Sequence, residues 1–219
     1  MKKAHTAAQA VDGIGDGASI MIGGFMGVGS PHRLIDELVR RGAGGLTVVC
    51  NDTARPGVGI GKLIDAGRVR RVITSHIGTN PVTQKAMLDG TLEVELVPQG
   101  TLAERIRAGG FGLGGILTPT GVGTLVAEGK QTLTVDGRDY LLELALKADF
   151  ALISAKRADY YGNLEYAFTA RNFNPLMAMA ATTTIAEAED VVPVGVIPPD
   201  AVVTPGVLVH VLVGRERSA

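Results

Sequence analysis

The chain has 219 residues, and 21 Lys and Arg against 22 Asp and Glu leave a formal net charge of −1. This balance disfavours nucleic acid or an anionic membrane as the main partner, because both require a basic surface. The single cysteine, Cys50, excludes an internal disulfide and a four-thiolate zinc site. No stretch of about 18 apolar residues predicts a membrane span, and the N-terminal segment lacks the apolar core of a secretory signal. We therefore expect a cytoplasmic, soluble protein.

The composition favours a sheet of buried parallel strands covered by helices. Glycine accounts for 30 residues, aromatic residues for only 4%, and tryptophan is absent. Many glycines without a repeat indicate many tight strand-to-helix turns. A core with few aromatic rings has to be filled by Val, Ile, Leu and Ala, as in parallel sheets with helices on both faces.

In the first half of the chain, short apolar runs alternate with amphipathic segments. Strands are predicted at 19–22, 46–50, 69–74 and 94–97, and helices at 31–39, 60–66, 81–88 and 101–108. Ser30 is the expected N-cap of the first of these helices. Thr101 and Glu104 suit a capping box at the start of the last, an interpretation that leaves the neighbouring Gln99 without a role. Such alternation implies right-handed crossovers and a parallel sheet.

The pattern changes after residue 108. A glycine-rich loop is predicted at 109–123, and a hairpin at 132–137 with Asp136-Gly137 at its turn. Further strands are predicted at 150–155, 164–168, 182–186, 191–196 and 207–213, and a helix at 175–181. No repeat or linker divides the chain. The expected fold is one α/β domain over residues 1–219, with a single open, mostly parallel sheet flanked by helices.

The strongest local signal is the glycine-rich loop between the first predicted strand and its helix. It consists of Gly23, Gly24, Phe25, Met26, Gly27, Val28 and Gly29. A glycine loop that leads into a helix offers backbone N–H groups and the positive end of the helix dipole to an anion. Its glycine spacing does not fit the dinucleotide fingerprint, and no Lys-Ser/Thr pair of a P-loop follows. A plain tight turn between strand and helix is the equally weighted alternative.

Polar residues follow other predicted strands. Gln99 stands between a strand and a helix, where ligands bind in such sheets, and its amide suits a developing oxyanion. Asn51, Asp52 and Thr53 follow the second strand and suit either a ligand or a turn. His76 follows the third, where a structural role is favoured over catalysis.

The sequence offers no evident nucleophile or metal site. Cys50 is expected to be an inert buried thiol, and the histidines lack the spacing of metal ligands. Glu93 and Glu95 are expected to be solvated. The chain thus has the loops of a substrate site without a group to attack the substrate.

Several segments in order along the chain resemble family I coenzyme A transferases. The resemblance is strongest with alpha subunits of the acetate and acetoacetyl branch. The matching segments are residues 16–31, Asn51-Asp52-Thr53-Ala54, residues 75–81, residues 98–107, residues 118–124 and Ala170-Arg171-Asn172-Phe173-Asn174.

The resemblance implies a two-part enzyme that moves coenzyme A (CoA) from an acyl-CoA to a carboxylic acid. In this family a glutamate in a Ser-Glu-Asn-Gly motif of the beta subunit attacks the thioester, and a glutamyl-CoA intermediate follows. The motif is absent from this chain. A beta subunit, in an α2β2 assembly, is therefore the expected partner, with no metal and no permanently bound cofactor.

The resemblance also implies roles for individual residues. The loop Gly23 to Gly29 would contact CoA, Gln99 would donate a hydrogen bond to the substrate or the oxyanion, and Asn51 would lie near the substrate. An acyl-CoA-binding or regulatory module without chemistry and a nucleotide-dependent oxidoreductase are the alternatives. The acyl specificity stays open, since one methylene in an apolar pocket changes binding by only about 1–3 kcal/mol.

Overall fold

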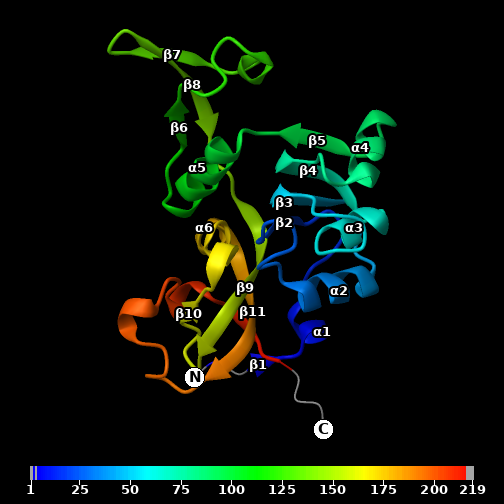
Figure 1. The fold of residues 1–219 in the computed structure, drawn as a ribbon, viewed down its shortest axis with the longest axis vertical. Coiled ribbons are helices and arrows are strands. Elements are labelled where there is room, and N and C mark those ends of the chain that lie inside the picture. Colours follow the sequence, from blue (N-terminus) through cyan, green and yellow to red (C-terminus); the bar gives the residue numbers. More distant parts are fainter. Residues whose placement is uncertain (1, 3, 216–219) are drawn as a thin grey trace.

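A computed structural model describes residue 2 and residues 4–215. A nine-stranded sheet runs through the molecule in the order β1-β12-β11-β9-β2-β3-β4-β5, with β10 added on β9 (Figure 1). Every pairing in this sheet is parallel except that of β10 with β9. Its strands are β1 (Ala4–His5), β2 (Ser19–Ile22), β3 (Leu46–Asp52), β4 (Val69–His76), β5 (Glu93–Leu96), β9 (Ala148–Asp159), β10 (Leu164–Glu165), β11 (Ala181–Val192) and β12 (Val211–Val213). The expected mostly parallel α/β sheet is confirmed.

Helices cover both faces of the sheet, and each face has its own hydrophobic core. The helices are α1 (Ala7–Ala10), α2 (His32–Arg41), α3 (Gly61–Asp65), α4 (Pro81–Leu88), α5 (Gln99–Gly110) and α6 (Asn174–Ala180). Residues of α1, α2 and α3 form one core with Ile20 and Ile22 of β2. Residues of α5 and α6 form the other core with Met21. The two faces follow from the alternation of side chains along a strand.

A small antiparallel sheet extends from the main body of the molecule (Figure 1). It consists of β6 (Gly115–Thr118), β7 (Thr132–Val135) and β8 (Arg138–Leu144), in the order β6-β8-β7. The turn between β7 and β8 is the predicted Asp136-Gly137, with φ of 50° and 74°. Positive φ at both central residues is the type I′ geometry that suits a two-residue hairpin, so this prediction is confirmed.

Several expected boundaries are wrong. The expected loop at 109–123 contains the end of α5 and the whole of β6. One strand, β11, contains the strand expected at 182–186 and only the first two residues of the strand expected at 191–196, and it pairs with β9 along its length. Only two residues of the expected strand 164–168 are in β10, and a 3₁₀ helix begins at Phe168.

Both expected helix caps are also wrong. Pro31 is the N-cap residue of helix α2, and it provides no side-chain hydrogen bond to cap this helix. Helix α5 begins at Gln99, two residues before Thr101, so Thr101 lies inside its first turn and its buried hydroxyl has no hydrogen-bond partner among the described residues. Glu104 instead pairs with Arg107 on the exposed side of α5.

None of the helices in the part of the chain that the structure describes is long and apolar enough to cross a membrane. No group of three or more His, Cys, Asp or Glu side chains in that part of the chain is arranged to hold a metal ion.

Candidate active site

Gln99, Asn51 and Asp52 form a continuous chain of hydrogen bonds at the carboxyl end of the parallel strands. The Nε2 atom of Gln99 donates to Oδ1 of Asn51 over 2.6 Å, and Nδ2 of Asn51 donates to Oδ2 of Asp52 over 2.7 Å. Asn51 and Asp52 end β3, whereas Gln99 begins α5 after β5. The two side chains singled out in the sequence, 48 residues apart, are therefore in direct contact.

Gln99 is at the solvent end of this chain of hydrogen bonds. It is the first residue of α5, and its side chain is exposed, whereas Asn51 and Asp52 are buried. A primary amide has two N–H bonds, so the bond to Asn51 leaves a second donor for a ligand. The N-cap residue of α5, Pro98, provides no side-chain cap, so the first N–H groups of this helix face the same region uncapped. This end of the sheet can receive a negatively charged oxygen.

The glycine loop ends in a tight turn rather than an open anion cradle. Phe25 and Val28 exchange both backbone hydrogen bonds, over 2.9 and 2.8 Å, and the N–H of Met26 donates to Oδ2 of Asp52 over 2.9 Å. Met26 and Gly27 at the tip have φ of 51° and 87°. Most of the donors expected to face an anion are thus bonded within the protein. The tip and the exposed side chains of Phe25 and Val28 are the parts that a ligand can contact.

The N-terminus of α2 is occupied by an internal carboxylate. The N–H of Leu34 donates to Oε2 of the buried Glu187 over 3.0 Å, and Nε of Arg33 pairs with Oε1 of the same residue. This carboxylate takes one of the N–H donors that the sequence interpretation offered to a ligand anion. A residue of β11, far from α2 in the sequence, provides it.

Asn174 holds the end of the glycine loop at Gly29 and was missed as a site residue. Its Oδ1 accepts from the N–H of Ser154, and its Nδ2 donates to the carbonyl oxygens of Gly29 and Ala170 over 3.0 and 2.9 Å. It is fully buried. The only sequence signal for it was its place in the segment 170–174 of the family resemblance.

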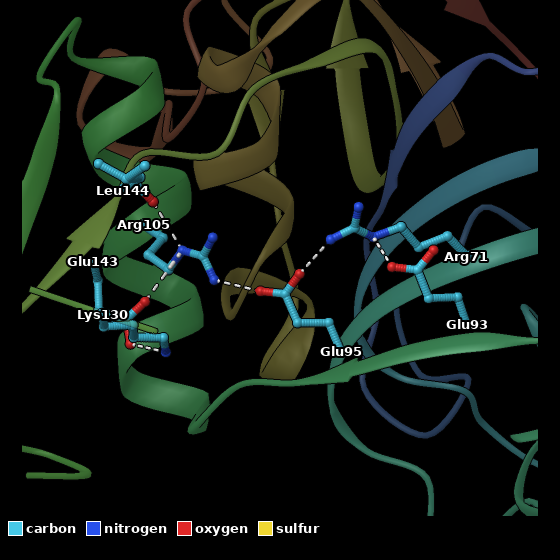
Figure 2. A network of polar contacts seen from close by, with 7 residues as sticks. All are labelled: Arg71, Glu93, Glu95, Arg105, Lys130, Glu143 and Leu144. Carbon is cyan, nitrogen blue, oxygen red and sulfur yellow. Dashed lines mark hydrogen bonds and ion pairs between the residues drawn. The ribbon is translucent and has the colours of Figure 1, made fainter. Parts of the chain in front are cut away.

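Helix α5 is anchored by a network of ion pairs between β4, β5 and the small sheet (Figure 2). Arg105 of α5 pairs with Glu95 over 2.9 Å and donates to the carbonyl oxygen of Leu144 over 2.8 Å. Burial alone would raise the pKa of Glu95, but the bonds from Arg105 and Arg71 outweigh it and hold the pKa below its usual value. Lys130 pairs with the buried Glu143 on the other side of Arg105. The expectation that Glu95 is solvated is wrong, and the network orients the helix that begins with Gln99.

Cys50 and His76 lie near the site without joining this chain of hydrogen bonds among the described residues. Cys50 is fully buried, and burial is the main cause that raises the pKa of its thiol to about 12. This agrees with the expected inert thiol. His76 is exposed at the end of β4, against the backbone of Gly78.

Comparison with known proteins identifies relatives that match almost the whole chain. A family model described as Coenzyme A transferase matches residues 4–215. The chain is 57% identical over 202 residues to the acetate CoA-transferase subunit alpha of Escherichia coli K12, and the match covers 92% of each chain. It is 52% identical to the acetoacetyl-CoA:acetate/butyrate CoA transferase alpha subunit of Clostridium acetobutylicum, over 90% of this chain and 91% of the relative.

A solved structure has the same fold at low sequence identity. The acyl-CoA transferase of E. coli O157:H7, in a thioester complex with CoA, superposes with a TM-score of 0.88 at 21% identity. The match covers 100% of this chain and 48% of that one, so the chain spans about half the length of that protein. The family model extends over nearly all described residues, and two relatives of matching length exceed half identity. The chain belongs to the coenzyme A transferase family.

Proposed function

We propose that this chain is the alpha subunit of a short-chain acyl-CoA:carboxylate CoA-transferase, of the acetate and acetoacetate type. Acyl-CoA and a short carboxylic acid are its substrates, and it acts with a beta subunit that provides the nucleophilic glutamate. The two curated relatives described above are named alpha subunits of acetate and acetoacetyl-CoA transferases, and their length matches that of this chain. This agreement supports the substrate class and the need for a partner.

The proposed reaction proceeds by exchange at carbonyl carbons. The partner's glutamate attacks the acyl thioester, the C–S bond breaks, and an acyl-glutamyl anhydride and CoA thiolate form. The thiolate then attacks the glutamyl carbonyl, which releases the first carboxylate and leaves glutamyl-CoA. The acceptor carboxylate reverses both steps and leaves as the new acyl-CoA. Each attack places negative charge on a carbonyl oxygen, so a fixed hydrogen-bond donor at that oxygen lowers every barrier.

The observation that carries the proposal is the amide of Gln99. One N–H of its Nε2 is held by Asn51 at 2.6 Å, which leaves the second at the uncapped start of α5. We assign that second N–H to the oxyanion or to the substrate carboxylate, and Asn51 to holding it in place. A fixed donor of this kind contributes about 2.7–4 kcal/mol to the transition state.

The carboxylate in this chain of hydrogen bonds, Asp52, is a poor nucleophile. Its oxygens accept hydrogen bonds from the N–H groups of Met26 and Ala54 and from the amide of Asn51. A carboxylate held by three donors and shielded from solvent has little free lone-pair density to attack a thioester. This supports a nucleophile on the partner subunit.

The glycine loop is the proposed contact with CoA. Gly23 and Gly24 are buried and shape the loop, whereas Phe25 and Val28 expose apolar side chains beside the Met26-Gly27 tip. An apolar tip next to polar side chains suits a ligand with an apolar arm and a reactive thioester. Gly29 ends the loop in contact with Ala170.

The test is a transfer assay on the complex with the partner subunit. The chain is tagged, purified from its host at low salt, and the co-purifying protein is sequenced. We expect a stoichiometric partner that has the Ser-Glu-Asn-Gly motif, and CoA transfer from acetoacetyl-CoA to acetate by the complex but not by the isolated chain. A complex that binds acyl-CoA but transfers none of it to any short-chain acid would contradict the proposal and favour a binding module.

A further inference from the structure

Asp52 is a buried carboxylate whose partners are all hydrogen-bond donors. Its side chain is 4% exposed. Oδ2 accepts from the N–H of Met26 over 2.9 Å and from Nδ2 of Asn51 over 2.7 Å, and Oδ1 accepts from the N–H of Ala54 over 2.7 Å. No Lys, Arg or His among the described residues forms an ion pair with it. A buried charge without a counter-ion is costly, so its retention calls for a role that a neutral side chain does not fill.

An ionised carboxylate can only accept hydrogen bonds, and this determines the orientation of two amides. Asn51 has to direct Nδ2 toward Asp52, so Oδ1 of Asn51 faces Gln99. Gln99 in turn has to direct Nε2 toward Asn51. The direction of both hydrogen bonds therefore starts at the charge of Asp52, although Asp52 and Gln99 are not in contact.

Asp52 also holds two residues in a strained backbone conformation. Met26 and Ala54 have φ of 51° and 54°. This left-handed region costs about 1 kcal/mol or more for a residue with a Cβ atom. The N–H groups of both residues donate to Asp52. One carboxylate thus connects the tip of the glycine loop with the amide of Gln99.

We propose that Asp52 is the positioning residue of the site: its charge sets the direction of the Asp52-Asn51-Gln99 hydrogen bonds, so that an N–H of Gln99, rather than its carbonyl oxygen, faces the substrate. The same charge holds the tip of the glycine loop against this chain of hydrogen bonds. The inference rests on the proposed function of Gln99. It adds a residue that acts on substrate only through Asn51 and Gln99.

The first test reverses the direction of these hydrogen bonds. It is measured by thermal unfolding and does not depend on enzymatic activity. Asp52→Asn places an amide at the position of the carboxylate. Where its Nδ2 takes the place of Oδ2, it donates to Oδ1 of Asn51 and gives up the hydrogen bond from the N–H of Met26. Asn51 can then turn its own Nδ2 toward residue 99. We expect Gln99→Glu to lower the melting temperature of the complex in the wild-type background, where the new carboxylate faces Oδ1 of Asn51 and both groups are acceptors. In the Asp52→Asn background the same substitution should lower the melting temperature much less.

A background without the amide separates hydrogen-bond direction from charge repulsion. Asp52→Ala removes the negative charge as Asp52→Asn does, but it provides no donor to Asn51. We expect Gln99→Glu to be tolerated better with Asp52→Asn than with Asp52→Ala. Equal losses in melting temperature in all three backgrounds, or equal rescue by both substitutions at residue 52, would overturn the proposed direction.

Asp159 provides a matched control for the activity test. It is 3% exposed, its Oδ1 accepts from the N–H groups of Tyr161 and Asn163, and its Oδ2 accepts from Nδ2 of Asn163. It therefore has the same set of donors as Asp52. Asp159 ends β9 seven residues beyond Leu152, which pairs with the end of β2, so it lies about 23 Å along the strand from that level.

In the complex with the partner subunit, we expect Asp52→Asn to lower kcat by about ten- to a hundredfold, because a misaligned donor no longer meets the oxyanion. Asp159→Asn should lower the melting temperature but leave kcat within about twofold of wild type. If Asp52→Asn transfers CoA at the wild-type kcat, the positioning role is wrong. If the wild-type complex transfers no CoA, the proposed function fails instead, and the melting-temperature test still decides the direction of the hydrogen bonds.

Discussion

The side-chain oxygen of Asn174 occupies the space that a Cβ atom on Gly23 would need. An ideal Cβ built on Gly23 would lie 1.8 Å from Oδ1 of Asn174, well inside van der Waals contact. Asn174 cannot move away easily, because it is fully buried and bonded to Ser154, Gly29 and Ala170. The first glycine of the loop is therefore required by a residue that follows it by 151 positions, counted as 174 − 23.

We expect Gly23→Ala to destabilise the protein by at least about 1–3 kcal/mol, the usual cost of overpacking a filled site. It should also displace the glycine loop and lower activity. Urea unfolding and the transfer assay measure the two effects. Gly13→Ala is the matched control, since a Cβ there meets no atom within 4 Å. Similar unfolding midpoints for the two variants would contradict the steric argument.

Much of the fold could be predicted from local pattern. The runs 19–22 and 46–50 are mostly apolar, and 69–74 combines apolar residues with two arginines; each run lies within a strand of the structure. Asp136-Gly137 specifies its hairpin by its own backbone preference. In these cases the residues that determine the structure are neighbours in the sequence.

The wrong predictions concern places where a residue far away in the sequence determines the local structure. Ser30 was expected to cap α2, but Glu187 of β11 accepts from the first turn of that helix. Glu95 was expected to be solvated, but Arg71 and Arg105 pair with it. A cap or ion pair between distant segments depends on how the chain folds back, and periodicity contains no information on that.

The site could be predicted in part. Gln99 and Asn51 were singled out because they follow strands, and parallel strands bring their carboxyl ends to one edge of the sheet. That Asn51 bonds directly to Gln99, and that Asp52 connects it to Met26, depends on the register and on side-chain geometry. The role of these residues in CoA transfer stays a prediction.

Gln99→Ala should reduce kcat by about a hundred- to a thousandfold, because the substitution removes a donor to the oxyanion. Its effect on stability should be small, since the side chain is exposed. Steady-state kinetics and thermal unfolding of the complex with the partner subunit measure both. Gln9→Ala is the control, because Gln9 is an exposed glutamine that bonds to Thr6 at α1. Equal fractional losses of activity and melting temperature in the Gln99 variant would argue against a role in catalysis.

The thiol of Cys50 should not react with iodoacetamide in the folded protein at pH 8. Burial is the main cause that raises its pKa from 9.0 to about 12, so the thiolate is scarce as well as inaccessible. Mass spectrometry after alkylation, with and without denaturant, measures the modification. Rapid alkylation of the native chain would show that β3 opens at this position.

The same pKa shift predicts how stability depends on pH. The folded state holds the thiol proton more tightly than the unfolded state, so this contribution is fully present below pH 9 and is lost between about pH 9 and 12. Relative to Cys50→Ala, wild type should lose up to about 1.4 kcal/mol per pH unit there. A difference between the two proteins that does not change with pH in this range would exclude the raised pKa.

Glu95→Gln should destabilise the protein at pH 7 and have a smaller effect in acid. Bonds from Arg105 and Arg71 hold the pKa of Glu95 below 4.5 against the opposing effect of burial. Its contribution to stability is therefore fully present above pH 4.5 and is lost as the pH falls through the lower, folded pKa. Because the Glu95 side chain is 31% exposed and thus partly screened by solvent, we expect about 1 kcal/mol or less at pH 7.

The control for this experiment is Glu104→Gln, in helix α5. Glu104 pairs with Arg107, and both side chains are 47% exposed, so its loss should change stability little at any pH. Urea unfolding of both variants and wild type between pH 3 and 7 provides the comparison. The Glu95 variant should approach wild type only at the acid end, because protonation removes the charge that Arg105 and Arg71 stabilise. A difference between Glu95→Gln and wild type that is as large at pH 3 as at pH 7 would mean that the side chain stabilises α5 by packing, and that its charge contributes nothing.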